Sequence, residues 1–219
     1  LKLAPLIARL ADQPPLEPTP AGNAFLEALL GETVEADGVE AAVARVREAD
    51  PLLATFLAEP MLGVTATPTK VKAGEKANVI PSGAEALVDT RVPPGMDAEA
   101  ARARLEALLG EGPYEIEFSE AVVGNASPVD SPLAGAIADW VSEADPGAEL
   151  APIVMPGFSD SHWFRKAFPE ATVYGFCPHR EIPLVEAAPL IHGADERVPA
   201  ADIGFAARFF FDLARRTLA

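Results

Sequence analysis

The 219 residues are enough for one large domain or two small ones, and an apolar content of 49% with 7% aromatic residues is typical of a globular protein. The net charge of −16, from 33 acidic and 17 basic residues, argues against a nucleic-acid partner and against an anionic membrane surface, because both bind basic faces. The single cysteine, Cys177, excludes an intramolecular disulfide, so we expect a cytoplasmic protein.

Proline and glycine residues divide the first sixty residues into several predicted helices. Apolar residues at helical spacing predict a helix over residues 1–12, which Pro14 and Pro15 end because proline cannot extend a helix. Further helices are predicted to end at Gly31, to begin near Asp37, and to begin at an Asp50 cap followed by Pro51.

The hydrophobic pattern then changes to a two-residue period. Leu62, Val64 and Ala66 alternate with small or polar residues, which predicts a strand over residues 62–69 with one buried face. A second strand is predicted over residues 83–91, where apolar residues again follow a loop.

A helix and a third strand complete the first half. The helix is predicted to begin near Asp97 and to end at Gly110, and the strand covers residues 114–119. The resulting order of helix, strand, strand, helix and strand is that of a split βαβ layer without its leading strand. We therefore expect a strand to precede Leu1.

After about residue 125 helices alternate with short apolar strands. The predicted elements are a helix capped by Ser131, a strand over 151–155, a helix over 159–168, a strand over 171–176 and a closing helix over 199–218. This alternation is typical of an α/β layer with a buried parallel sheet. Charged residues lie on one narrow face of the closing helix, so we expect its wide apolar face to pack on a sheet whose other strands are not in this chain.

The ends of the chain indicate part of a longer protein. The chain begins at Leu1 and its first methionine is Met61. No apolar run approaches the roughly 20 residues that span a bilayer, and no signal peptide is visible.

The three histidines, His162, His179 and His192, all lie in the second half, and none is part of an H-x-D or H-E-x-x-H spacing. Cys177, His179 and Glu181 form a possible ligand cluster or a proline-stiffened loop with a surface histidine. By itself, His192 is equally compatible with a metal ligand, a general base and a polar residue near a helix start.

Two further segments contain candidate substrate-binding residues. Gly157 permits a close turn after a predicted strand, and Ser159 lies where a helix begins, so this turn binds an anion or is capped in the ordinary way. A serine hydrolase pairing of Ser159 with His192 also stays open. Asn78 lies in a loop between strands, and Arg91 ends the second strand, where a guanidinium either binds a carboxylate or is a surface charge.

The ordered set of motifs strongly resembles one family of enzymes. The motifs are NVIPSGAEALVDTRVPPG, PGFSDSHWFR, GFCP and HGADERVP. Together they are similar to the co-catalytic metallopeptidases that include aminoacylase, acetylornithine deacetylase, succinyl-diaminopimelate desuccinylase and glutamate carboxypeptidase. The resemblance implies an α/β fold in which residues 1–122 form an incomplete ferredoxin-like lid, or dimerisation, domain and residues 123–219 form the C-terminal part of the catalytic domain.

The resemblance also implies roles for particular residues. His192 matches a metal ligand, and Asn78, Arg91, Gly157 and Ser159 match the site for the substrate carboxylate. Family members carry two zinc ions, and cobalt or manganese also suits such ligands. From their position we infer that Asp195 and Glu196 orient the His192 imidazole. Phe158 stands where many relatives have a smaller residue, which implies either an altered substrate pocket or simple packing at this position.

The implied activity is hydrolysis of an amide or peptide bond next to a free carboxylate, in a small peptide or an N-acyl amino acid. The implied assembly is a homodimer through the lid. The family's H-x-D motif, bridging aspartate and Glu-Glu pair have no counterpart here, so we expect this chain to be inactive alone. The alternative is a non-catalytic dimerisation or binding module derived from the same family.

Overall fold

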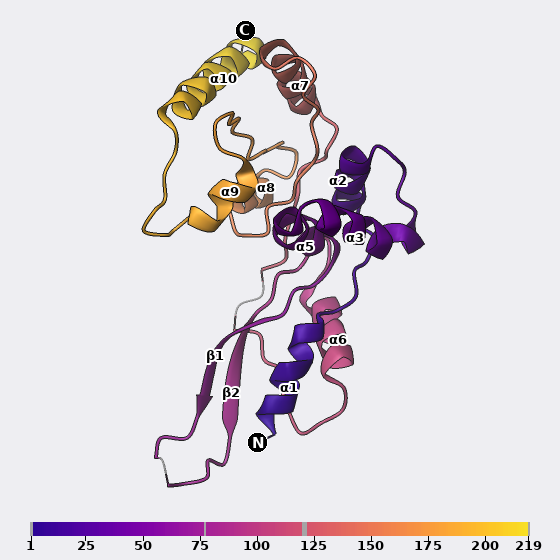
Figure 1. The fold of residues 1–219 in the computed structure, drawn as a ribbon, viewed down its shortest axis with the longest axis vertical. Helices are drawn as coiled ribbons and strands as arrows, with labels where there is room; N and C mark the ends of the chain where they lie inside the picture. Colours follow the sequence, from indigo (N-terminus) through magenta and orange to yellow (C-terminus); the bar gives the residue numbers. More distant parts are fainter. Residues whose placement is uncertain (1, 77, 120–121, 219) are drawn as a thin grey trace.

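The computed structural model describes residues 2–76, 78–119 and 122–218 (Figure 1). The elements of the first half are α1 (Leu3–Arg9), η1 (Leu10–Asp12), α2 (Pro20–Leu30), η2 (Ala36–Gly38), α3 (Val39–Ala49), α4 (Pro51–Leu53), the π-helical turn η3 (Ala54–Ala58), α5 (Glu59–Leu62), β1 (Thr67–Ala73), β2 (Ala84–Asp89) and α6 (Ala98–Leu109). Those of the second half are α7 (Pro132–Ala144), α8 (Ser161–Ala167), α9 (Leu184–Ala187), η4 (Ala188–Leu190) and α10 (Ala200–Leu218).

Helices α2 to α5 surround the first apolar core, in the middle of Figure 1. Local signals define their ends: the Thr19 side chain accepts the Gly22 N–H, and Gly31 ends α2 in the left-handed conformation, with φ of 69°. Their apolar faces bury Phe25, Leu26, Val39, Val43, Met61 and Leu62. The helical prediction for the first sixty residues is therefore confirmed.

β1 and β2 form an antiparallel hairpin, with Thr67 opposite Asp89 and Ala73 opposite Ala84. Helix α1 lies beside β2, and α6 lies beside α1 (Figure 1). A second core of Leu10, Ala66, Leu105 and Leu109 is buried there. The side chain of Gln13, directly after η1, joins the N-terminal helical segment to the residue before β1. Its Oε1 accepts the Ala66 N–H at 2.9 Å, and its Nε2 donates to the Ala66 carbonyl at 3.1 Å.

The first predicted strand lies further along the chain than expected. Leu62, Val64 and Ala66 are buried as predicted, but Leu62 ends α5, and ladder pairing begins only at Thr67. The buried alternation thus belongs to the segment that enters the sheet.

The other three predicted strands carry no ladder in the described part of the chain. In each of them, side chains bond the backbone groups that a neighbouring strand would otherwise bond. Arg102 donates to the Ile116 carbonyl at 2.6 Å, and the Val154 N–H donates to the Met61 sulfur at 3.1 Å. Ser127 bonds both the N–H and the carbonyl of Val173. The predicted parallel sheet is therefore not observed in the described residues, where the sheet has two antiparallel strands.

A third apolar core joins α7 to α10 near the C-terminus. Trp140 contacts the rings of Phe205 and Phe209, at centroid distances of 5.2 and 5.0 Å. The predicted apolar face of α10 is thus partly covered by a helix, while Phe210 and Phe211 stay 52% and 62% exposed. No helix of the described residues is both long and apolar enough to cross a membrane.

Replacing Leu26, which is fully buried in α2, should destabilise the helical core. We expect Leu26→Ala to lower the free energy of unfolding by about 2–5 kcal/mol, because it leaves a cavity among close-packed side chains. Leu29→Ala, at a 41% exposed position of the same helix, should change it by only about 0.5 kcal/mol. Urea denaturation followed by circular dichroism measures both, and equal losses would contradict this core.

Candidate functional site

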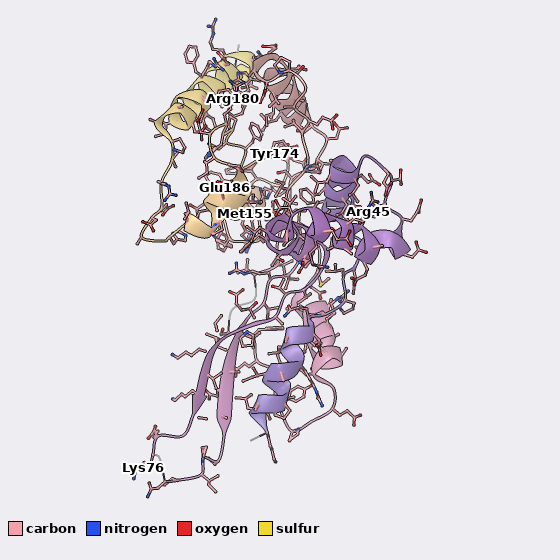
Figure 2. The ribbon with its side chains drawn as sticks, in the orientation of Figure 1. Arg45, Lys76, Met155, Tyr174, Arg180 and Glu186 are labelled. Carbon is pink, nitrogen blue, oxygen red and sulfur yellow. The ribbon has the colours of Figure 1, made fainter. Side chains whose placement is uncertain are left out.

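The two candidate residues of the lid lie towards opposite ends of the hairpin. Asn78 is exposed in the loop that joins β1 to β2, close to Lys76, which Figure 2 labels at the hairpin tip. Arg91 follows the other end of β2, where its backbone pairs with Thr65. Since β2 alone spans about 17 Å at ~3.4 Å per residue, the fold of one chain does not bring Asn78 and Arg91 together.

The Arg91 guanidinium already holds a carboxylate. Its Nε donates to Asp89 Oδ1 at 2.6 Å and its Nη2 donates to Asp89 Oδ2 at 2.9 Å, a bidentate pair. Both side chains are more than two-fifths exposed, so water weakens the pair. An external carboxylate would have to displace Asp89 from the same donor fork.

Gly157 and Ser159 lie in an exposed turn before α8. The Ser159 hydroxyl lies 2.7 Å from the Ser161 hydroxyl and accepts the Ser161 N–H at 3.2 Å. This contact is a local turn, and the described hydrogen bonds do not join Ser159 to His192. Phe158 is 53% exposed and contacts the rings of His162 and Trp163, at centroid distances of 5.5 and 6.0 Å.

His192 has an unusual backbone. Its φ of 64° lies in the left-handed region, which a non-glycine residue rarely adopts. The Glu196 Oε2 accepts the His192 backbone N–H at 3.1 Å and thereby closes the turn, and all three of His192, Asp195 and Glu196 are exposed. Glu196 thus bonds the main chain of His192, while Asp195 contributes its carbonyl oxygen to Arg197. The predicted contact of these carboxylates with the imidazole stays a prediction.

The described residues contain no group of three or more histidine, cysteine, aspartate or glutamate side chains that could hold a metal ion. In the cluster of Cys177, His179 and Glu181, the cysteine is exposed, and His179 Nδ1 lies 3.9 Å from Asp202 Oδ2. His192 is therefore a single candidate ligand in this part of the chain.

Asp202 is a buried, hydrogen-bonded carboxylate that the sequence pattern did not single out as a candidate. It is 1% exposed in the first turn of α10, and its Oδ1 accepts the backbone N–H groups of Arg180 at 2.7 Å and Glu181 at 3.1 Å. Burial opposes ionisation of Asp202, but N–H groups of residues 180–182 and the nearby His179 outweigh burial and lower the pKa of the carboxyl. An aspartate in the first turn of a predicted helix was the available signal.

Asp202 joins the loop that contains Arg180 and Glu181 to α10, so its charge should matter for stability. Because its pKa is lowered in the folded protein, its contribution is complete above the ordinary value of about 3.9 and disappears as pH falls through the lowered value. We expect Asp202→Asn to lower the melting temperature by several degrees at pH 7 and by much less near pH 2.

Thermal unfolding followed by tryptophan fluorescence checks this difference between the two pH values. Asp130→Asn is the control, because Asp130 is an exposed aspartate before α7. A pH-independent effect of Asp202→Asn would show that the carboxylate charge is not what holds the loop.

The comparisons with known proteins address the first half of the chain. Residues 1–117, which contain α1 to α6 with the β1–β2 hairpin, match the family described as the peptidase dimerisation domain. No curated protein and no solved structure matches the chain. Because the match covers more than half of the 219 residues, the chain belongs to the peptidase dimerisation domain family.

Proposed function

We propose that the chain is the C-terminal portion of a cytoplasmic, homodimeric, metal-dependent hydrolase of the aminoacylase and acetylornithine deacetylase type. The observation that carries this proposal is the family match over residues 1–117, followed in the same chain by the PGFSDSHWFR and HGADERVP motifs. Residues 1–122 then form the dimerisation domain, and residues 123–219 contribute to an α/β catalytic domain.

The open sheet supports a second copy of the chain as the partner. Two antiparallel strands form a marginal sheet alone, and their outer edges present backbone groups that pair readily with another strand. Apolar side chains are also exposed on both strands, with Val71 at 55% and Leu87 at 56%.

The hydrolytic part of the proposal assigns His192 as one ligand of a zinc centre. The described residues alone do not fit such a centre, because a zinc site takes three or four donors and they supply one suitable imidazole without a cluster. The remaining ligands are therefore proposed to come from other parts of the complete protein, and this chain alone is proposed to be inactive. The left-handed backbone of His192 supports a functional role, since such strain gathers at functional sites.

The proposed substrate is a small peptide or an N-acyl amino acid whose scissile bond lies next to a free carboxylate. Arg91 supports this assignment, because its exposed guanidinium holds the Asp89 carboxylate in the bidentate geometry that a substrate carboxylate would use. Asn78, Gly157 and Ser159 are proposed to complete the carboxylate site. The turn at Ser159 offers a hydroxyl exposed to solvent.

One observation favours a second function, a non-catalytic dimerisation or binding module. The family match itself covers the dimerisation segment, residues 1–117. The two proposals differ in whether His192 matters for metal binding.

Dimerisation should depend on the hairpin. We expect sedimentation equilibrium to give twice the 23.0 kDa mass of one chain, and the double variant Val71→Lys, Leu87→Lys to weaken the dimer by at least about tenfold, because lysine on exposed strands opposes strand pairing. The matched control is Leu184→Lys with Val198→Lys, each about half exposed outside the matched segment. A monomer at all concentrations would exclude the proposed homodimer.

The role of His192 can be tested in the complete gene product that contains this chain. We expect His192→Ala to weaken zinc binding and to slow the hydrolysis of N-acyl amino acids and dipeptides by at least about 100-fold, because loss of even an outer-shell partner of a metal costs ~10–100-fold. His162→Ala is the control from the same half of the chain. Unchanged zinc content and rate would contradict the assignment of His192 as a zinc ligand, whereas absence of zinc and of hydrolysis in the unsubstituted protein would support the non-catalytic module.

A further inference from the structure

A cavity of about 310 Å³ lies at the start of α10, and none of the candidate residues of the proposed hydrolytic site lines it. Phe205 and Gly204 form part of its wall, together with the charged side chains of Arg180, Glu181, Asp202 and Arg208. Its size is at the lower end of small-molecule sites, about 300–1,000 Å³. Figure 2 labels Arg180 beside α10, at this cavity.

Two guanidinium groups share one aromatic ring in this cavity. The Arg180 Cζ lies 4.2 Å from the Phe205 ring centroid, and the Arg208 Cζ lies 5.3 Å from the same centroid. The separation of the two Cζ atoms therefore cannot exceed the sum of these two distances. Each is attracted to the ring, but they repel one another, and an anion between them would remove that repulsion.

Carboxylates of the described residues leave this pair of cations largely unpaired. Arg180 donates to the Ala144 carbonyl and reaches Asp145 only at 4.0 Å, and no described carboxylate lies within 4.0 Å of the Arg208 guanidinium. Asp202 lines the cavity, but its oxygens accept backbone N–H groups of residues 180 and 181.

The buried Asp202 carboxylate opposes an anion here, and so does Glu181, whose exposed side chain lines the same cavity. Glu181 makes no ion pair within 4.0 Å among the described residues. Its removal should therefore favour an anion without breaking a described contact.

We propose that this cavity binds a small molecule through a carboxylate or phosphate group held between Arg180 and Arg208, with its apolar part against Phe205. A planar guanidinium donates two parallel hydrogen bonds to either oxyanion, and the aromatic wall excludes water from one side of the group. Arg208 has its donors available, while Arg180 is already oriented by its bond to the Ala144 carbonyl.

Isothermal titration of the whole chain with sodium phosphate, and separately with sodium succinate, tests this proposal at constant ionic strength in chloride. Saturable binding of either probe is expected, and the probe that binds more tightly identifies the oxyanion. Arg208→Gln should weaken binding by at least about tenfold, since it removes a charge-assisted fork. Glu181→Gln should tighten binding several-fold.

Arg215→Gln is the matched control, because Arg215 is an exposed arginine of the same helix that lies 5.7 Å from the Phe211 ring, outside this cavity. It should leave binding unchanged. Circular dichroism should show native helix in every variant, since all three side chains are exposed. Absence of saturable binding by both probes, or equal weakening by Arg208→Gln and Arg215→Gln, would overturn the proposal.

Discussion

The packing of α1, η1 and α6 at the end of the β1–β2 hairpin that contains Ala66 and Val88 is the contact on which the dimerisation part of the chain depends. Two strands alone seldom bury enough apolar surface to be stable, and here Leu10, Ala66, Leu105 and Leu109 supply the missing core. The Gln13 side chain then joins this core to the helical part by pairing with both backbone groups of Ala66. Most residues of β1 and half of those of β2 stay exposed, and an exposed sheet edge pairs readily with another strand.

Local signals made the helices predictable from the sequence. The Asp97 and Ser131 side chains accept the N–H groups of Ala100 and Ala134, as their positions indicated, and the helices begin where expected. The strands were less predictable, because a ladder requires a neighbouring strand, which is often distant in sequence. The apolar run at residues 171–176 was predicted to be a strand of a buried parallel sheet, but no ladder is described there, and Ser127 and Arg165 bond the backbone of Val173.

In the candidate site, too, the sequence predicted where residues lie on the elements better than it predicted which partners they bind. The sequence placed Arg91 at the end of a strand, and the structure agrees, but nothing in the pattern indicated that Asp89 would already hold its guanidinium. The role of Asp202 could not be predicted, because its hydrogen-bond partners are backbone N–H groups about twenty residues earlier in the chain. A side-chain motif carries no information about such partners. Proximity in sequence predicted a contact of Glu196 with the His192 imidazole, which stays a prediction; the contact described is with the main-chain N–H of His192.

The excess of acidic residues makes an arginine that contacts an aromatic ring instead of a carboxylate unusual in this chain. With 33 acidic and 17 basic residues, a guanidinium readily finds a carboxylate, and Arg45, Arg104 and Arg216 each do so. Arg208 instead faces the rings of Phe205 and Trp140. An aromatic face attracts a cation without neutralising it, so the positive charge stays available to an external anion. An arginine paired with a surface carboxylate has little charge left for a ligand. Arg208 keeps its positive charge beside the cavity, and this supports the proposed anion site.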